Sequence, residues 1–182
     1  MNSPRSRLLW VQRWGFSWQG WLTNRRGEWW LLAQLLVIAA HCLPPTPSPL
    51  SLGVLWPAWL RVLGGLVLAL GLWRAALSAR GLGGSLTPLP CPIDGAPLII
   101  DGPYRHCRHP LYQAVLLCSL GVVVLLGSLL HLALLVLLAV VLVQKAHREE
   151  AHLCALHEGY GAYRQTTVAI VPGLPGLDWR GP

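Results

Sequence analysis

The sequence predicts an all-α integral membrane protein with about four transmembrane helices, a C-terminal helical hairpin and an N-terminal interfacial helix. Two observations support this fold class. Of the 182 residues, 54% are hydrophobic and only 12% are charged, whereas a soluble domain averages about 25% charged residues. Residues 111–143 also form one uncharged run, which is too long for a single span of about 20 residues. We therefore expect one domain embedded in a bilayer.

Residues 1–28 form the first predicted region, a basic, Trp-rich segment in the plane of the lipid headgroups. Its tryptophans recur at helical spacing, with arginines between them: Trp10, Trp14, Trp18 and Trp21. This pattern is typical of a helix that lies on a membrane rather than crossing it. The segment has no clean apolar core followed by a small-residue cleavage site, so we expect no removable signal peptide.

Residues 29–80 are expected to hold the first two transmembrane helices. The first covers residues 29–43 and ends at the proline-rich stretch 44–49, because proline cannot continue a helix. The second covers residues 55–77. Three small residues on this second helix would permit close contact with a neighbouring helix: Gly64, Gly65 and Gly71.

Residues 81–110 form a long connector rich in glycine and proline, and long irregular stretches of this kind usually have a function. Residues 111–158 then form a transmembrane hairpin with a cytoplasmic extension. We expect its turn at Gly127-Ser128, and one long tilted helix is the alternative. Residues 159–182 form the C-terminal tail.

The distribution of charge predicts the orientation of this multi-pass protein. The net charge is +7, from 14 Lys and Arg against 7 Asp and Glu. Basic residues lie before the first span, in the connector and in the tail, whereas the loop at 44–51 and the turn at Gly127 contain none. The positive-inside bias therefore predicts cytoplasmic termini and a cytoplasmic active site. Long uncharged runs argue against nucleic acid as a partner. Five cysteines without CxxC spacing predict no disulfide framework.

A dense polar cluster at residues 102–112 adjoins the hairpin. Pro110 suits the first turn of a helix, where its missing N–H is not needed. Arg108 and His109 would then lie at the helix N-terminus, where free amides and the helix dipole favour an anion. Arg105 could join Arg108 on one carboxylate or phosphate. The simpler interpretation is that these basic residues anchor the span at the membrane boundary.

A second polar group ends the hairpin. Lys145 and Glu149 are four residues apart and share a helix face. Glu149 and Glu150 point about 100° apart, so only one should face the hairpin partner squarely. Either glutamate could accept a proton. A solvated helix end is the simpler interpretation. The nearby histidines spread around the helix, so we expect no metal site: His147, His152 and His157.

The order GPYRxxRHPxY, an apolar hairpin, EExxL, YxxY and then Pro172 resembles the isoprenylcysteine carboxyl methyltransferase family. The broader group includes phospholipid N-methyltransferases of membranes. The resemblance covers residues 98–172. It implies an integral membrane enzyme that moves a methyl group from S-adenosylmethionine to a lipophilic acceptor, most like protein-S-isoprenylcysteine carboxyl O-methylation. The acceptor, a small molecule or a prenylated protein, would enter from the membrane lipids.

The resemblance also implies where the cofactor and the acceptor bind. The implied cofactor-binding residues are Ala96, Pro97, Leu98, Ile99, Tyr104, His109, Pro110, Leu111 and Tyr112. The acceptor-binding residues would be Lys145 and Glu149, and the candidate catalytic residues are Arg108, Glu149 and Glu150. The family commonly has Arg where Lys145 stands. The other positions at which this sequence departs from the family pattern lie toward the acceptor-binding residues: Ala114, Leu156-His157 and Val168-Ala169.

The chemistry of S-adenosylmethionine agrees with these residue types. Tyrosine faces and a glutamate suit the sulfonium cation. His, Arg and a helix N-terminus suit the carboxylate. An apolar strand at residues 98–100 would suit the adenine.

Three alternatives remain open at the level of sequence. The first is a phospholipid N-methyltransferase. The second is an enzyme of the sterol-reductase type that uses NADPH, but such an enzyme is expected to need many more spans than 182 residues allow. The third is a non-catalytic membrane adaptor that uses the basic rim for binding.

Overall fold

The computed structural model describes residues 14, 18–93 and 95–180, and all regular structure within these residues is helical. The predicted all-α fold is confirmed. The α-helices are α2 (Trp18–Thr23), α3 (Glu28–Ala40), α4 (Ala58–Leu82), α5 (Pro110–Leu126), α6 (Leu129–Leu156) and α7 (Tyr160–Thr166). Three short 3-10 helices lie between them: η1 (Leu50–Leu52), η2 (Gly83–Ser85) and η3 (Gly102–Arg105).

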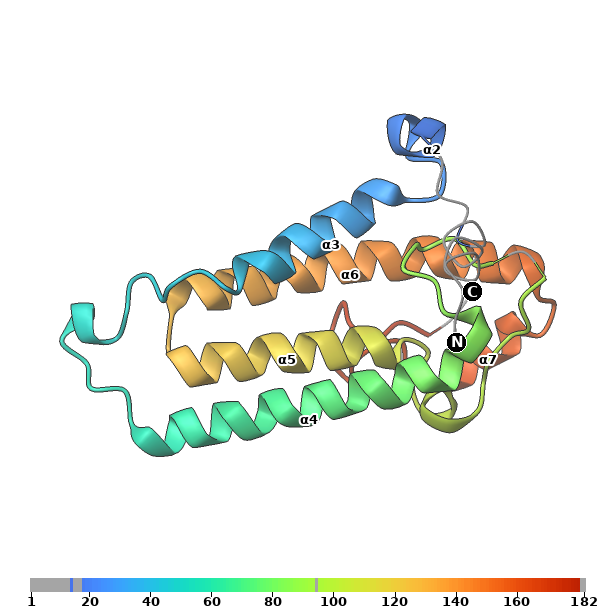
Figure 1. Cartoon of the computed structure of the whole chain (residues 1–182). Coiled ribbons are helices and arrows are strands. Elements are labelled where there is room, and N and C mark those ends of the chain that lie inside the picture. Colours follow the sequence, from blue (N-terminus) through green and yellow to red (C-terminus); the bar gives the residue numbers. More distant parts are fainter. Residues whose placement is uncertain (1–13, 15–17, 94, 181–182) are drawn as a thin grey trace, which may run out of the picture.

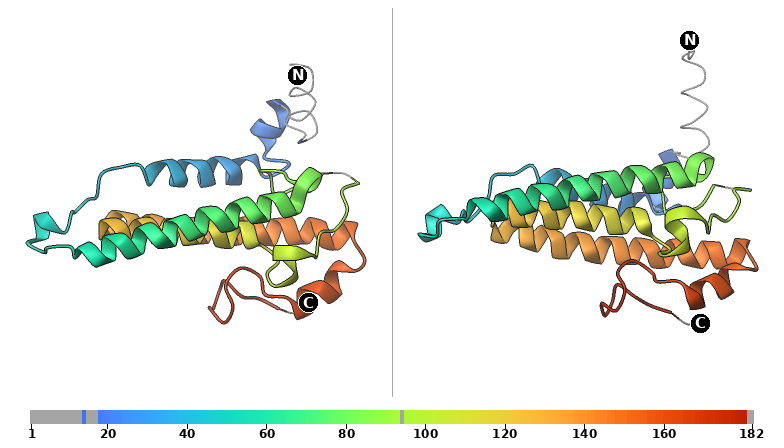
Figure 2. Two further views of the ribbon diagram at one scale, coloured as in Figure 1. Left: turned by 60° about the horizontal axis from the view of Figure 1, so that its bottom comes forward. Right: turned by 90° about the horizontal axis from the view of Figure 1, so that it is seen from below.

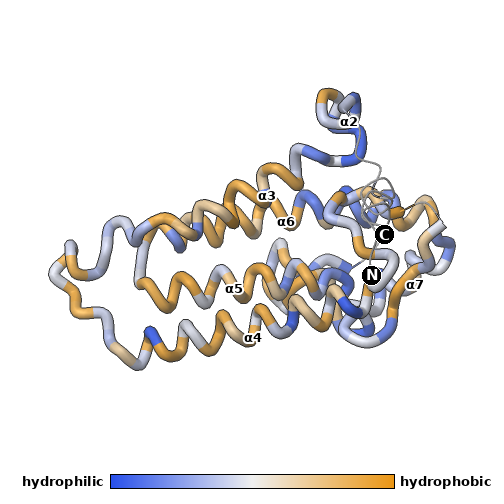
Figure 3. Tube along the Cα trace, viewed as in Figure 1, coloured by the Kyte–Doolittle hydropathy of each residue, from blue (hydrophilic) through white to orange (hydrophobic). Residues whose placement is uncertain are grey.

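Four apolar helices lie side by side in the order α3, α6, α5, α4 (Figure 1). Helices α4 and α6 are long and apolar enough to cross a membrane, and α3 and α5 are shorter apolar helices. Figure 3 shows apolar residues along the four helices and polar residues gathered at one end, around α7 and the connector. The fold therefore separates an apolar body from a polar end.

Both of the first two predicted spans differ from the observed helices at their ends. The first was expected at 29–43, but α3 has 13 residues, Glu28–Ala40. A helix of this length is about 20 Å long, against about 30 Å for the hydrocarbon core. The chain leaves α3 at His41, whose ring nitrogens lie 2.8 Å from Val37 O and 2.6 Å from Ser119 Oγ. The second span, expected at 55–77, starts after Pro57 and continues to Leu82.

The predicted interfacial helix falls largely on residues 1–13 and 15–17, which lie outside the described residues. Within the predicted segment, the six residues Trp18–Thr23 form α2. The predicted strand at 98–100 is wrong, because this stretch has no regular secondary structure. No neighbouring strand in the described part of the chain is available to pair with it.

The predicted hairpin turn is confirmed. Helix α5 ends at Leu126, Gly127 caps it with a φ of 61°, and α6 begins at Leu129. A Cβ on Gly127 would lie 2.6 Å from the ring of Trp56. A left-handed backbone and a close aromatic neighbour both favour glycine here.

Helices α4 and α5 pack closely through glycines. A Cβ added to Gly64 would lie 2.3 Å from the backbone nitrogen of Leu125, and one on Gly71 would lie 2.6 Å from Cys118 Sγ. The close contact predicted for these two positions is confirmed. The same prediction for Gly65 is wrong, because an added Cβ there would meet no heavy atom within 4 Å.

The variant Gly64→Ala is expected to lower the free energy of unfolding by about 1 to 3 kcal/mol, because the added methyl group collides with the α5 backbone. Gly65→Ala is the matched control. It should be neutral or should stabilise α4 by up to about 1 kcal/mol, since alanine favours helix more than glycine does. Denaturant titration of the detergent-solubilised protein measures both. Equal losses for the two variants would contradict close α4–α5 packing.

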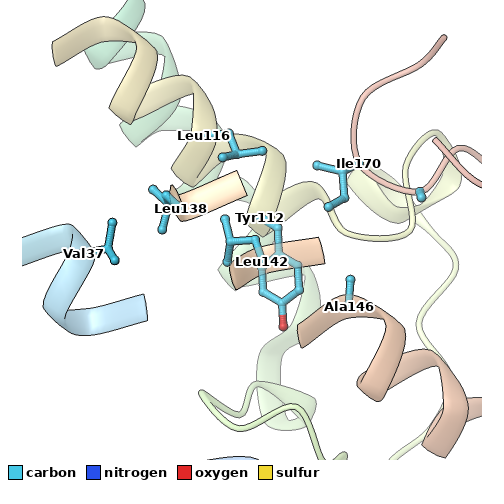
Figure 4. Close-up of a cluster of buried hydrophobic side chains, with 8 residues drawn as sticks. Val37, Tyr112, Leu116, Leu138, Leu142, Ala146 and Ile170 are labelled. Carbon is cyan, nitrogen blue, oxygen red and sulfur yellow. The ribbon is translucent and has the colours of Figure 1, made fainter. Parts of the chain in front are cut away.

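The C-terminal tail folds back against the start of α5. Val168 forms a parallel bridge with Cys107, and the backbone N–H of Arg108 donates to Val168 O at 2.8 Å. Figure 2 shows the tail, in red, outside the row of helices. Ile170 of the tail joins a buried cluster with Tyr112 of α5 and with residues of α3 and α6 (Figure 4). This cluster fixes the tail relative to the polar end of the bundle.

Candidate active site

His109 lies between the two glutamates of α6. Its Nε2 is 3.0 Å from Glu150 Oε1, and its Nδ1 is 3.8 Å from Glu149 Oε2. Tyr112, stacked on the imidazole with ring centroids 5.2 Å apart, donates its hydroxyl to Glu149 Oε2 at 2.7 Å. The two distant polar segments therefore meet, but the expectation that only one glutamate would face α5 is wrong. The two ring nitrogens let one imidazole reach both carboxylates.

Arg108 holds α5, α6 and the tail together. Its Nε donates to Glu150 Oε1 at 2.8 Å, and both side chains are almost fully buried. The remaining guanidinium nitrogens donate to the carbonyls of Arg164, Thr167 and Trp179. Arg108 therefore binds a carboxylate of the protein itself, and Arg105, which is exposed, is not among the residues paired with that carboxylate. The catalytic role of Arg108 and Glu150 stays a prediction.

Trp179 completes the surroundings of Glu150. Its indole N–H donates to Glu150 Oε2 at 2.8 Å, while the other carboxylate oxygen binds Arg108 and His109. Sequence reasoning missed Trp179, because it lies in the tail and belongs to no motif. The contacts give Glu150 a full set of protein partners, which favours a positioning role.

A cavity of about 80 Å³ lies beside this cluster, between the connector, α6 and α7. The predicted cofactor residues Ala96, Pro97, Leu98, Ile99 and Tyr104 line it, together with Glu149. The structure does not place the other four among its lining residues: His109, Pro110, Leu111 and Tyr112. Of these four, His109 and Tyr112 contact the carboxylate of Glu149, which does line the cavity.

Tyr160 and Tyr163 of α7 also line the cavity, with Tyr104 of η3. Burial raises the pKa of all three hydroxyls well above the usual range, so they are neutral hydrogen-bond groups at physiological pH. Tyr104 donates to Ser78 O at 3.4 Å, and Tyr163 donates to Tyr104 O. The buried Tyr160 hydroxyl has no hydrogen-bond partner in the structure. Sequence reasoning missed Tyr160 and Tyr163 as site residues, although their YxxY spacing is visible in the sequence.

Lys145 lies on the connector side of Tyr112. Its Nζ is 5.3 Å from the centre of the Tyr112 ring, and Glu149 accepts the hydroxyl of the same tyrosine. The predicted shared face of Lys145 and Glu149 is confirmed. The buried ammonium donates to Gln34 Oε1 and to Pro88 O, both at 2.7 Å. Lys145 therefore ties α3 and the connector to α6, and its binding of an acceptor stays a prediction.

The described residues contain no group of three or more His, Cys, Asp or Glu side chains placed to hold a metal ion. All five cysteines are free thiols. Cys107 is buried beneath the tail, and its Sγ donates to Ala169 O at 3.2 Å. Burial raises the pKa of this thiol to about 11.

Maleimide is expected to label Cys107 roughly 100-fold more slowly than an ordinary exposed thiol, because the thiolate is the reactive form. Cys154, which is exposed on α6, serves as the internal reference. Mass spectrometry of peptides from the labelled native protein gives both rates. Labelling of Cys107 as fast as that of Cys154 would show that the tail does not cover it.

A family model described as phospholipid methyltransferase matches residues 59–161. This match covers more than half of the chain. The protein belongs to the phospholipid methyltransferase family. It is thus related to the wider group that includes the isoprenylcysteine enzymes. No curated protein and no solved structure matches the chain.

Membership of the phospholipid methyltransferase family supports a membrane methyltransferase over a non-catalytic adaptor. The matched residues run from α4 to the start of α7, so they include Glu149, Tyr104 and Tyr160 as well as the connector. Members of the family generally use S-adenosylmethionine. The tail that contacts Arg108 and Glu150 lies beyond the matched residues.

Proposed function

We propose that this protein transfers a methyl group from S-adenosylmethionine, bound in the tyrosine-lined cavity, to a lipophilic acceptor supplied by the membrane. One observation carries the proposal. Tyr160, whose buried hydroxyl has no hydrogen-bond partner in the structure, lines the cavity together with two further tyrosines and Glu149. Buried polar groups without partners are rare in proteins, and a ligand that binds here would satisfy this one.

The chemistry of the lining residues fits the cofactor. A sulfonium cation is attracted to the faces of tyrosine rings and to the carboxylate of Glu149. Leu98 and Ile99 offer apolar contact for an adenine ring, and their backbone, which belongs to no helix or strand, leaves amide groups to read its edge. When bound, S-adenosylmethionine supplies an activated methyl group. The protein's contribution is to orient the reactants and exclude water, which together account for much of the rate in such displacements.

Tyr112 fixes the position of the Glu149 side chain. Its Oε2 accepts the Tyr112 hydroxyl, and the side chain remains 28% exposed at the cavity. This hydrogen bond orients the carboxylate of Glu149 beside the expected position of the cation. Glu149 is therefore the residue to which we assign recognition of the sulfonium.

The connector must move for the cofactor to enter. The cavity of about 80 Å³ is smaller than the roughly 300 to 1,000 Å³ of pockets that hold drug-sized ligands. Lys145 holds the connector at Pro88, which precedes the lining residues 92–93 and 96–99 in the chain. We propose that residues 96–99 move away from α6 while the contact at Pro88 persists.

For the acceptor, we propose the carboxylate of a prenylated cysteine, as the resemblance implies. O-methylation of a carboxylate needs no base, which agrees with the engagement of His109 and Glu150 by each other. A phospholipid amine is the second candidate, and two observations favour it. The matched family is described as phospholipid methyltransferase, and Glu149 lines the cavity where an amine proton would have to be accepted.

We also propose that the site faces the cytoplasm. Basic residues gather at the end of the bundle that carries the connector, the cavity and the tail, including Arg80, Arg105 and Arg164. The loop at 44–51, at the opposite end of α3 and α4, has none. This distribution agrees with the positive-inside bias.

Two measurements on the purified protein test the proposed function. Calorimetric titration with S-adenosylmethionine should show binding, and titration with NADPH should show none. Labelled S-adenosylmethionine is then offered with a farnesylated cysteine analogue or with phosphatidylethanolamine vesicles. Label in the first product supports carboxyl methylation, and label in the lipid extract supports N-methylation. A protein that binds NADPH and not S-adenosylmethionine would overturn the proposal.

A further inference from the structure

A second hollow lies along the apolar body of the protein. It has a volume of about 830 Å³, within the range of ligand pockets. Its walls are α4, α5, α6 and the tail loop at 174–177. It shares no lining residue with the tyrosine-lined cavity. We call this hollow the lipid-facing groove, since most of its lining is apolar: Leu117, Leu120, Leu135, Val136 and Val140.

One end of the lipid-facing groove is polar. Arg74 of α4 and Gln113 of α5 line it, and Arg74 donates to Gln113 Oε1 at 2.7 Å. Gln113 in turn donates to Ile170 O at 2.7 Å, which fixes the pair against the tail. Among the described residues no carboxylate lies within ion-pair distance of Arg74. The end of the groove therefore presents a half-buried positive charge with no carboxylate partner in the described part of the chain.

The two ends of the groove match the two parts of an amphiphile. Arg74 lies toward the C-terminal end of α4, and Gln113 lies in the first turn of α5, so both are at the polar end of the bundle. The rest of the groove follows the uncharged middle of α5 and α6. A cation in the membrane is costly without a partner, and a lipid phosphate at headgroup depth would supply one.

We propose that the lipid-facing groove binds an anionic phospholipid, with one acyl chain along the apolar walls and the phosphate against Arg74. This site is separate from the methyl-donor cavity, and the proposal does not depend on methyl transfer. The lipid would fill the space between the tail loop and the helices. In that position it would hold the tail, which also contacts Arg108 and Glu150, against the bundle.

Native mass spectrometry of the full chain, released from detergent, tests the site. The probes are phosphatidylglycerol and a diacylglycerol with the same chains. We expect one phosphatidylglycerol to remain bound and the diacylglycerol to bind more weakly, because it lacks the phosphate. Arg74→Gln should weaken phosphatidylglycerol binding about tenfold, as expected for the loss of one charge-assisted contact. Arg80→Gln is the matched control, because Arg80 is exposed on the same helix near the same end.

A second variant tests the groove itself. Val140 lines the groove and is 53% exposed, so Val140→Trp should block the chain site without disturbing the core. We expect it to abolish retention of both probes. Unchanged phosphatidylglycerol binding by either Arg74→Gln or Val140→Trp would overturn the proposal. Equal weakening by Arg74→Gln and Arg80→Gln would also overturn it, because it would show attraction to the basic end as a whole. No methyl donor is present, so these results leave the proposed function untouched.

Discussion

Arg108→Leu is expected to lower the free energy of unfolding by about 3 to 5 kcal/mol, the usual cost of removing one member of a buried ion pair. The substitution leaves the carboxylate of Glu150 buried without its closest cation, 2.8 Å away in the native protein. It also removes the donors to the carbonyls of Arg164, Thr167 and Trp179. Denaturant titration in detergent, followed by tryptophan fluorescence, measures the loss.

Arg105→Leu is the matched control for this prediction. Arg105 lies three residues earlier, is exposed and should change the free energy of unfolding by less than about 0.5 kcal/mol. The double variant Arg108→Leu/Glu150→Leu should recover part of the loss, because no unpaired charge remains. It cannot recover all of it, since the three carbonyls still lack donors. An Arg108→Leu protein as stable as the Arg105→Leu protein would show that the buried ion pair between Arg108 and Glu150 does not stabilise the fold.

Much of the fold could be predicted because its signals are local. The apolar run favours two helices in residues 111–158 over one long tilted helix, and Gly127-Ser128 near the middle of the run is the natural turn. Pro110 at the first turn of α5 then set the start of the hairpin. These features depend on residues close together in the chain. The end of α3 and the start of α4 were less predictable. His41, where the chain leaves α3, contacts Ser119 of the distant helix α5, and Pro57 immediately precedes α4.

The meeting of His109 with Glu149 was also predictable, since an antiparallel hairpin brings its two ends together. The contribution of the tail was not. Trp179 reaches the site through a turn in residues 171–177, and no sequence pattern specifies where that turn returns. For the same reason, the sequence leaves open which carboxylate or phosphate Arg108 binds and whether Arg105 shares it. A cation's partner is decided by long-range packing, which composition and spacing do not reveal.

The contrast between Gly64 and Gly65 has a similar origin. Both glycines lie on α4, yet only Gly64 faces α5. A helix that is apolar on all sides has no amphipathic pattern to indicate which side meets its neighbour. The sequence could therefore predict that small residues permit close packing, and only the structure shows which of them are used.

Glu149→Gln is expected to weaken binding of S-adenosylmethionine by roughly 10- to 100-fold, the range that corresponds to losing one interaction with a charged group. The fold should persist, because the glutamine oxygen can still accept the Tyr112 hydroxyl and the side chain is only partly buried. Calorimetric titration measures the affinity, and a thermal unfolding curve checks the fold. Glu158→Gln is the matched control, since Glu158 is exposed just after α6 and does not line the cavity.

The same variant separates two roles for Glu149. If it recognises the sulfonium, the affinity for S-adenosylmethionine falls for every acceptor and at every pH at which the carboxylate is ionised. If it instead accepts a proton from an amine, cofactor affinity is unchanged and only methyl transfer is lost, which would contradict the cation role. Tyr112→Phe sharpens the distinction, because it removes the hydroxyl that fixes Glu149 and leaves the charge in place. A recognition role requires this variant to weaken cofactor binding less than Glu149→Gln does, since attraction between charges depends less on orientation than proton transfer does.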